Sequence, residues 1–311
     1  MNRQLEKAYE LIEKELKPGY QVLYLSYAGS KLHGTDHEDS DLDLKGIYMP
    51  TEKDMILGNY PKTLSLSTGS ADSKNNKEDV DVFLYSLFEF IDKLAKSDIN
   101  AVELFFSIDS AAKIDSSFLI EYMRRHMPFQ FSYSSFKGFS SKNFSKVLSA
   151  KENLKKLEKL RDLIEQESDC NLKLKDLDLS DFNYDKKFLK LKDNFKLGLN
   201  ATICYAYDLI QEKISEYGYR IKTDDSEFKA LSHALRSLLE AKELKETGKI
   251  RFPLRDAYHL REIKLGNVDK DRIIENIEKL EKKVSQYEGV KNDQEIVNDF
   301  KYVLYKMYFE V

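Results

Sequence analysis

Two acids separated by one residue form the part of this sequence best suited to chemistry. Asp41 and Asp43 lie in the alternating stretch DLDLKGIY, which predicts a β-strand over residues 41–48. Because side chains alternate across a strand, both carboxylates leave the same face. Neighbouring carboxylates repel each other unless a cation lies between them, and their hard oxygen atoms are ligands that suit Mg²⁺. The pair therefore predicts a metal site, and a strand with solvated acids is the alternative.

A second stretch repeats this geometry. Asp79 and Asp81 open the run DVDVFLY, which predicts another strand over residues 79–85. If the two strands are neighbours, their carboxylates converge, and such a cluster is costly without a metal ion. Asp81 lies deeper in the apolar run and is the preferred third ligand, while Asp79 remains its close competitor.

A Gly-Ser pair ends the first apolar run of the chain, QVLYLSYA at residues 21–28. Gly29 allows a positive φ or a close backbone approach, and Ser30 can open a short helix whose exposed amides attract phosphate oxygen atoms. The alternative is an ordinary capped turn. Lys45 shares the strand face of Asp41 and Asp43, where it could neutralise phosphate or remain solvated.

The order of these features resembles the nucleotidyltransferase superfamily typified by DNA polymerase beta. In that family a Gly-Ser pair precedes two acids, and a third acid follows on a later strand. Here ten residues separate Ser30 from Asp41. The sequence looks most like the stand-alone predicted nucleotidyltransferases of bacteria and their phages, to which the segments at residues 98–107 and 228–244 are also similar.

The resemblance implies a reaction and assigns roles to residues. Asp41 and Asp43 would bind two Mg²⁺ ions, with Mn²⁺ as an alternative, and Asp81 would complete the site and take the acceptor proton. Ser30 and the backbone of Gly29 would hold the phosphates of an NTP donor. The acceptor hydroxyl would attack the α-phosphorus, and pyrophosphate would leave.

The acceptor is less well defined. Residues 122–151 contain basic and aromatic side chains but no acid, which favours an RNA surface where phosphates meet cations and bases stack on rings. Packing of those rings in a core is the alternative. We expect the 3′ end of an RNA or tRNA as the acceptor. The other hypotheses are AMPylation of a protein, modification of a small molecule, and an inactive nucleotide-binding module.

Helical spacing predicts one more contact with the substrates. Lys229, His233 and Arg236 follow each other at i, i+4 and i+7, so they share one helical face. We expect Lys229 and Arg236 to reach the triphosphate or the acceptor.

The elements predict an α+β protein with a small mixed sheet. Short strands alternate with helices up to about residue 130, and helical periodicity dominates afterwards. We expect a nucleotidyltransferase domain over residues 1–130 and an α-helical domain over residues 131–311. The predicted helices of the second half cover residues 142–167, 186–216, 226–247, 255–264, 269–287 and 292–309.

Composition excludes several classes of protein. The net charge is −4, so any site for a polyanion must be a local patch. No apolar stretch approaches the roughly 20 residues that cross a bilayer, and the amphipathic N-terminus lacks a signal-peptide core. Cys170 and Cys204 are the only cysteines, and we expect two buried, reduced thiols in a cytoplasmic protein without a membrane partner. The oligomeric state is left open.

Overall fold

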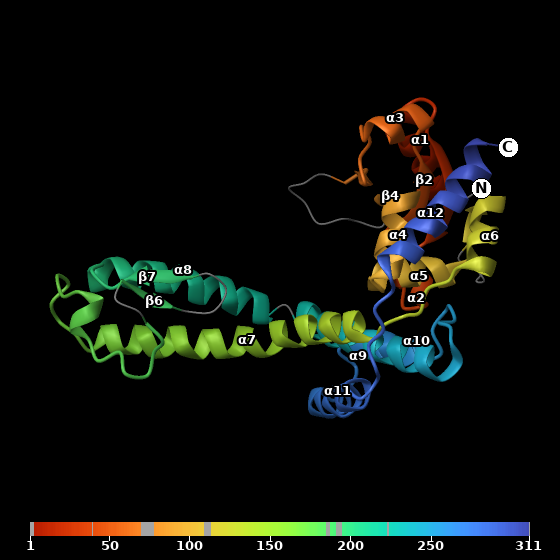
Figure 1. Cartoon of the computed structure of the whole chain (residues 1–311). Helices are drawn as coiled ribbons and strands as arrows, with labels where there is room; N and C mark the ends of the chain where they lie inside the picture. The colour runs from red at the N-terminus through yellow and green to blue at the C-terminus, as the bar shows by residue number, and fades with distance from the viewer. Residues whose placement is uncertain are drawn as a thin grey trace. The chain divides into compact units, whose positions relative to one another are not determined.

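The computed structural model describes residues 3–38, 40–69, 78–108, 113–184, 187–190, 195–222 and 224–310. It confirms the predicted α+β class, because a small mixed sheet is accompanied by many helices (Figure 1). Within these ranges, none of the helices has the length and hydrophobicity needed to traverse a lipid bilayer.

The main sheet has five strands. Their order across the sheet is β3 (Thr63–Ser67), β4 (Val80–Ser86), β2 (Leu42–Met49), β1 (Gln21–Tyr27) and β5 (Lys113–Ser116). The β2–β4 pair is parallel, and the other pairs are antiparallel. Strands β2 and β4 lie where apolar alternation predicts them, and β1 lies within the first apolar run, residues 21–28. The sequence analysis does not predict β5, because this four-residue strand contains a single apolar side chain, Ile114.

Alternation divides the residues of β2 and β4 between two faces. Leu42, Leu44, Val80 and Val82 are almost completely buried and form one core cluster with helix α1 (Arg3–Glu15). Helix α1 therefore covers one face of the sheet, and the acids between these apolar residues point to the other face.

The helices that accompany the sheet begin at residues suited to capping. Ser86 accepts a hydrogen bond from the backbone of Glu89 at the start of α4 (Leu87–Ala95), and Asp98 caps α5 (Ile99–Ser107). Three further helices in this part of the chain are α2 (Gly29–His33), α3 (Glu52–Leu57) and α6 (Phe118–His126). The later helices are α7 (Ser134–Glu165), α8 (Ile203–Lys222), α9 (Asp224–Thr247), α10 (Ala257–Lys264), α11 (Lys270–Val284) and α12 (Gln294–Phe309).

Two compact units divide the chain. The first contains residues 1–139, 235–262 and 274–311, and the second contains residues 140–234 and 263–273. These units do not divide the chain at residue 130, because residues near the C-terminus contact helix α4, which belongs to the first unit. Lys301 of α12 forms an ion pair with Asp92 of α4, and the Asn292 amide donates to the backbone carbonyl of Ala95.

The second unit contains a hairpin that the sequence analysis does not predict. Helix α8 lies alongside α7, and the strands β6 (Phe188–Lys190) and β7 (Lys196–Gly198) lie near them (Figure 1). The predicted helix over residues 186–216 is therefore wrong in its first half. Leu189 and Leu197 face each other in the hairpin and are buried, which is strand geometry rather than helical spacing.

The prediction of two reduced thiols is wrong in this structure. Cys170 and Cys204 form a disulfide with 5.2 Å between their Cα atoms. Backbone hydrogen bonds bring these segments together: Leu174 donates to Ala201, and Ile203 donates to Leu172. The sequence does not indicate that these two cysteines lie close together, because they meet only when the chain before α8 folds back.

Candidate active site

The parallel register of β2 and β4 brings the predicted acids together. Asp43 lies directly opposite Asp81, and Asp41 immediately precedes β2. Carboxylate oxygen atoms of these three residues lie within 4.8 Å of one another. All three residues are partly exposed, so solvent can reach the cluster.

This cluster suits a divalent cation. It supplies several hard oxygen donors at one point, and mutual repulsion of the three carboxylates is relieved when a cation binds among them. Asp79, the competing third acid, is outside this group, and its backbone carbonyl instead accepts a hydrogen bond from Leu42. Asp81 therefore lies together with Asp41 and Asp43, and Asp79 does not.

The Gly-Ser turn packs directly against the acids. Gly29 has a φ of +54°, and a Cβ atom placed there would lie 2.1 Å from Oδ2 of Asp43. The backbone N–H of Ala28 also donates to the carbonyl of Asp43 at 2.9 Å. Only glycine combines this backbone conformation with this close approach. The turn and the acids, which are distant in sequence, thus form one local structure, with Ser30 in the first turn of α2.

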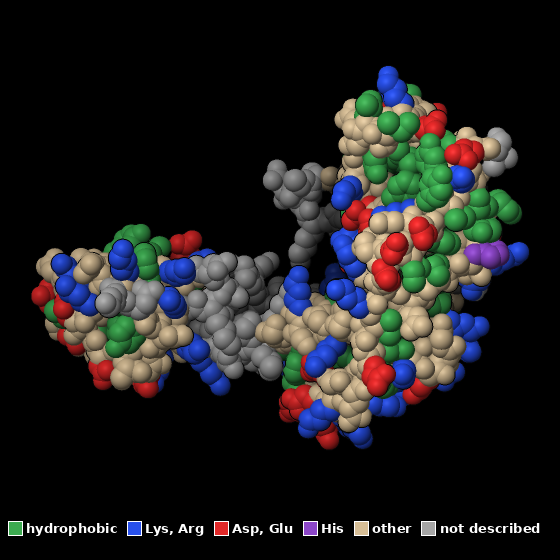
Figure 2. Space-filling model, in the orientation of Figure 1, with side chains coloured by type: hydrophobic (Ala, Val, Ile, Leu, Met, Phe, Trp, Pro, Cys, Tyr) green, Lys and Arg blue, Asp and Glu red, His purple; other side chains and the backbone are tan. Residues whose placement is uncertain are grey.

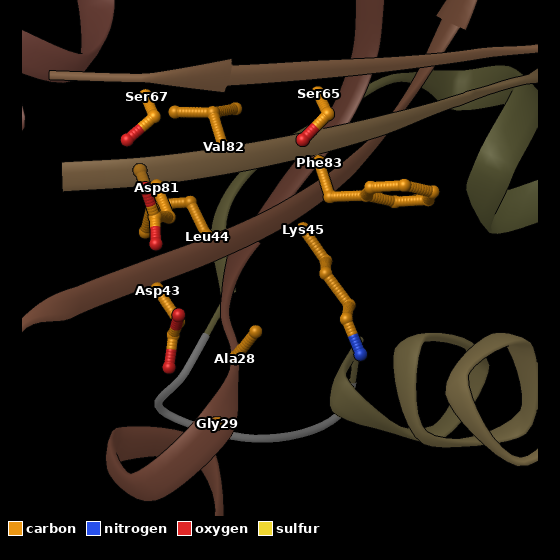
Figure 3. A pocket seen from close by; sticks show the side chains of 10 residues that line it. All are labelled: Ala28, Gly29, Asp43, Leu44, Lys45, Ser65, Ser67, Asp81, Val82 and Phe83. Atoms are coloured by element: carbon orange, nitrogen blue, oxygen red, sulfur yellow. The ribbon is translucent and has the colours of Figure 1, made fainter. Parts of the chain in front are cut away.

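A cavity of about 440 Å³ opens above these residues, within the range of small-molecule sites (Figure 3). Two rows of side chains cross its sheet face. One row is Ser67, Asp81 and Asp43, and the other is Ser65, Phe83 and Lys45. The sequence analysis missed both serines and Phe83. The alternation in the segment TLSLS was the signal, because it places Ser65 and Ser67 on one face.

Lys45 lies in the cavity, as the strand alternation predicts. Its Nζ atom donates to Oδ1 of Asn100 at 2.5 Å and lies 4.0 Å from Oε2 of Glu103. Burial lowers the pKa of Lys45, and the Glu103 carboxylate opposes this shift. Two residues of α5 therefore hold the amine of Lys45.

Arg236 does not face the cavity. It is 7% exposed, and its guanidinium donates to Glu103, to Glu240 at 3.0 Å and to Nε2 of His33 at 2.8 Å. We call these four residues the buried charge cluster. The structure thus places Arg236 in the interior. There its guanidinium, which was expected to reach the triphosphate, binds two carboxylates and an imidazole.

Burial governs the ionisation of this cluster. It lowers the pKa of His33 to about 4, and the positive charge of Arg236 acts in the same direction. It also raises the pKa of Glu240 to about 8, against the attraction of Arg236. For Glu103 burial favours the neutral acid, but Arg236 and His33 outweigh it and hold the pKa well below its usual range.

The other predicted contacts have mixed outcomes. Lys229 is exposed and belongs to the second unit, so its contact with the substrates stays a prediction. In the segment 122–151, Phe129, Phe136 and Phe144 are buried, so these rings are core residues and cannot stack on bases. Arg125 and Lys142 are exposed, and their contact with RNA also stays a prediction.

Comparisons with known proteins match most of this chain. Residues 1–304 match the model of the family described as "RNA repair pathway DNA polymerase beta family". A 38.9 kDa protein of Enterobacteria phage T4, encoded in the nrdC–mobD intergenic region, is 27% identical over 274 residues. The alignment covers 78% of this chain and 82% of the phage protein.

The close approach of Gly29 to Asp43 can be tested against a second glycine. Gly58 has a similar φ of +63°, but a Cβ atom there would meet nothing within 4 Å. We expect Gly58→Ala to cost about 1–2 kcal/mol of stability, because only the left-handed backbone is strained. Gly29→Ala should cost more and also displace the Asp43 carboxylate. Urea unfolding of both variants measures the difference, and equal losses would contradict the contact.

The raised pKa of Glu240 predicts a pH dependence of stability. Between about pH 4.5 and pH 8 the folded protein binds a proton here that the unfolded chain releases, so the contribution of Glu240 to stability falls as pH rises. Glu240→Gln should therefore become more stable relative to the wild type between pH 5 and pH 9, by an amount on the order of a few kcal/mol.

Urea unfolding across this pH range measures that change. Glu243→Gln is the matched control, since Glu243 lies on the same helix and is partly exposed, whereas Glu240 is fully buried. Its stability relative to the wild type should stay constant with pH. A constant difference for Glu240→Gln as well would show that Glu240 is ionised in the folded protein.

Proposed function

Because the chain belongs to the RNA repair pathway DNA polymerase beta family, we propose that it transfers a nucleoside monophosphate from an NTP to the 3′-hydroxyl of an RNA. The family match confirms the expected membership of the polymerase beta-like superfamily, and with it nucleotidyltransferase activity. The donor nucleotide, the RNA acceptor and the roles of individual residues are proposals.

One observation carries the proposal. The in-register pairing of Asp43 with Asp81 places two carboxylates side by side, Asp41 adds a third, and Gly29 packs against the same group. Transfer from a triphosphate needs a phosphate-binding turn in contact with a cation site. The reason is that the negative charge of the phosphates must be neutralised where the bond breaks.

In this mechanism Asp41, Asp43 and Asp81 would hold two Mg²⁺ ions. The ions, when bound, neutralise the developing charge on the attacking and leaving oxygen atoms. The backbone of Gly29 and the hydroxyl of Ser30 bind the β- and γ-phosphates. Lys45, held by Asn100, adds a positive charge on the donor side of the cavity.

We assign Asp81 the role of acting on the acceptor. It lies in the row with Ser67 and Asp43, nearer than Asp43 to the edge strand β3. An acceptor hydroxyl that enters along β3 meets Asp81 first, and its carboxylate takes the proton as the oxygen attacks the α-phosphorus. The new phosphodiester bond forms as the bond to pyrophosphate breaks.

The test uses each α-labelled NTP with Mg²⁺ and two matched RNAs that differ only in a 3′-hydroxyl or a 3′-phosphate. We expect label on the 3′-hydroxyl RNA alone. Total protein and aminoglycosides, offered separately, distinguish the other acceptor classes, and label on either of them instead of RNA would contradict the proposed acceptor.

Variants of the acids test the site itself. Asp43→Asn and Asp81→Asn should each lower the transfer rate about a thousandfold, which corresponds to about 4 kcal/mol of transition-state stabilisation. Asp79→Asn is the matched control and should retain most of the activity. Loss of activity in Asp79→Asn with an active Asp81→Asn would reassign the third ligand.

A further inference from the structure

The segment before and within α10 carries exposed positive charge. We call Arg251, Arg255, Tyr258 and Arg261 the α10 surface. All four are exposed, and the ring of Tyr258 is 76% exposed. In residues 249–261 the only acid is Asp256, although the chain as a whole is net acidic. Lys and Arg side chains gather in the region of α10 in Figure 2.

The three arginines of this surface have no acidic partner within the described part of the chain. Other cations of the first unit do pair: Lys17 with Asp54, and Lys301 with Asp92. Neighbouring cations that lack counter-charges repel each other, and an anionic ligand relieves this repulsion. The α10 surface is therefore complementary to a polyanion.

This surface is attached to the candidate active site. The backbone N–H of Leu254 donates to the carbonyl of His33 at 3.2 Å, and a Cβ atom on Gly34 would lie 2.8 Å from Cβ of Pro253. Phe252 and Leu254 are buried, so the chain between Arg251 and Arg255 is anchored. Helix α2, with five residues, is about 7 Å long and separates this anchor from Gly29.

The exposed ring decides which kind of polyanion fits. Tyr258 and Arg261 lie three residues apart on α10, so they share one helical face. A ring beside cations binds unpaired bases by stacking while the cations bind phosphates, and this combination suits a single strand. In the segment 122–151 the rings of Phe129, Phe136 and Phe144 are buried, so these rings cannot stack on bases beside the cations of that segment.

We propose that the α10 surface binds the acceptor RNA as a single strand, next to the end that enters the cavity. Arg251, Arg255 and Arg261 bind its phosphates, and Tyr258 stacks on an unpaired base. This inference rests on the proposed function for the identity of the polyanion. It concerns binding alone and includes no chemical step.

The test measures binding of an unstructured, fluorescein-labelled RNA of twelve nucleotides by anisotropy, with EDTA and without NTP. In Arg255→Glu/Arg261→Glu the dissociation constant should rise roughly tenfold, and the slope of log Kd against log salt should fall by about 1.4, because two phosphate contacts are lost. Tyr258→Ala should weaken binding about tenfold without changing this slope, because stacking carries no charge.

The matched control is Lys53→Glu/Lys96→Glu, which changes the net charge equally at two exposed lysines of the same unit. Its binding should equal that of the wild type. Wild-type binding by Arg255→Glu/Arg261→Glu, or an equal loss in the control, would overturn the proposal.

A third variant separates this inference from the proposed function. Asp43→Asn should lose nucleotidyl transfer and keep wild-type RNA binding, since Asp43 lies outside the α10 surface. The wild type could transfer no nucleotide while Arg255→Glu/Arg261→Glu still weakens RNA binding. That result would contradict the proposed function and support the α10 surface as an RNA-binding site.

Discussion

The site depends on one constraint, the parallel and in-register pairing of β2 with β4. Side chains alternate along a strand, so a shift of one residue in β2 would turn Asp43 toward α1 and Leu44 into the cavity. Burial of Leu44 and Val82 against α1 opposes that shift, because it would expose apolar side chains and bury a carboxylate. The apolar face of the sheet thereby fixes the position of the acids on the other face.

The buried charge cluster connects elements that carry residues of the same site. Arg236 of α9 binds His33 at the end of α2 and Glu103 of α5, and Glu103 in turn lies near Lys45. Ion pairs withdrawn from water are costly to break, since the remaining charge is left without compensation. The cluster therefore joins α2, which begins at Gly29, to α5, which holds Lys45. Arg236 lies within this cluster and is not among the residues that line the cavity.

The local features of the site were predictable from sequence, and its long-range contacts were not. Alternation around Asp43 and Asp81 specifies both the strands and the shared face, because these patterns are local. The inward position of Arg236 depends on Glu103, which is distant in sequence, and nothing near Arg236 indicates it. The pairing of Cys170 with Cys204 and the short strand β5 likewise depend on how distant segments meet.

Binding of a divalent cation tests the central claim most directly. Mn²⁺ titrated into the protein with a non-hydrolysable NTP can be followed by the loss of the free-ion signal in electron paramagnetic resonance. We expect saturable binding that Asp43→Asn and Asp81→Asn each weaken strongly, while Asp79→Asn binds as the wild type does. Equal Mn²⁺ binding by all four proteins would contradict a cation site made by the pairing of β2 with β4.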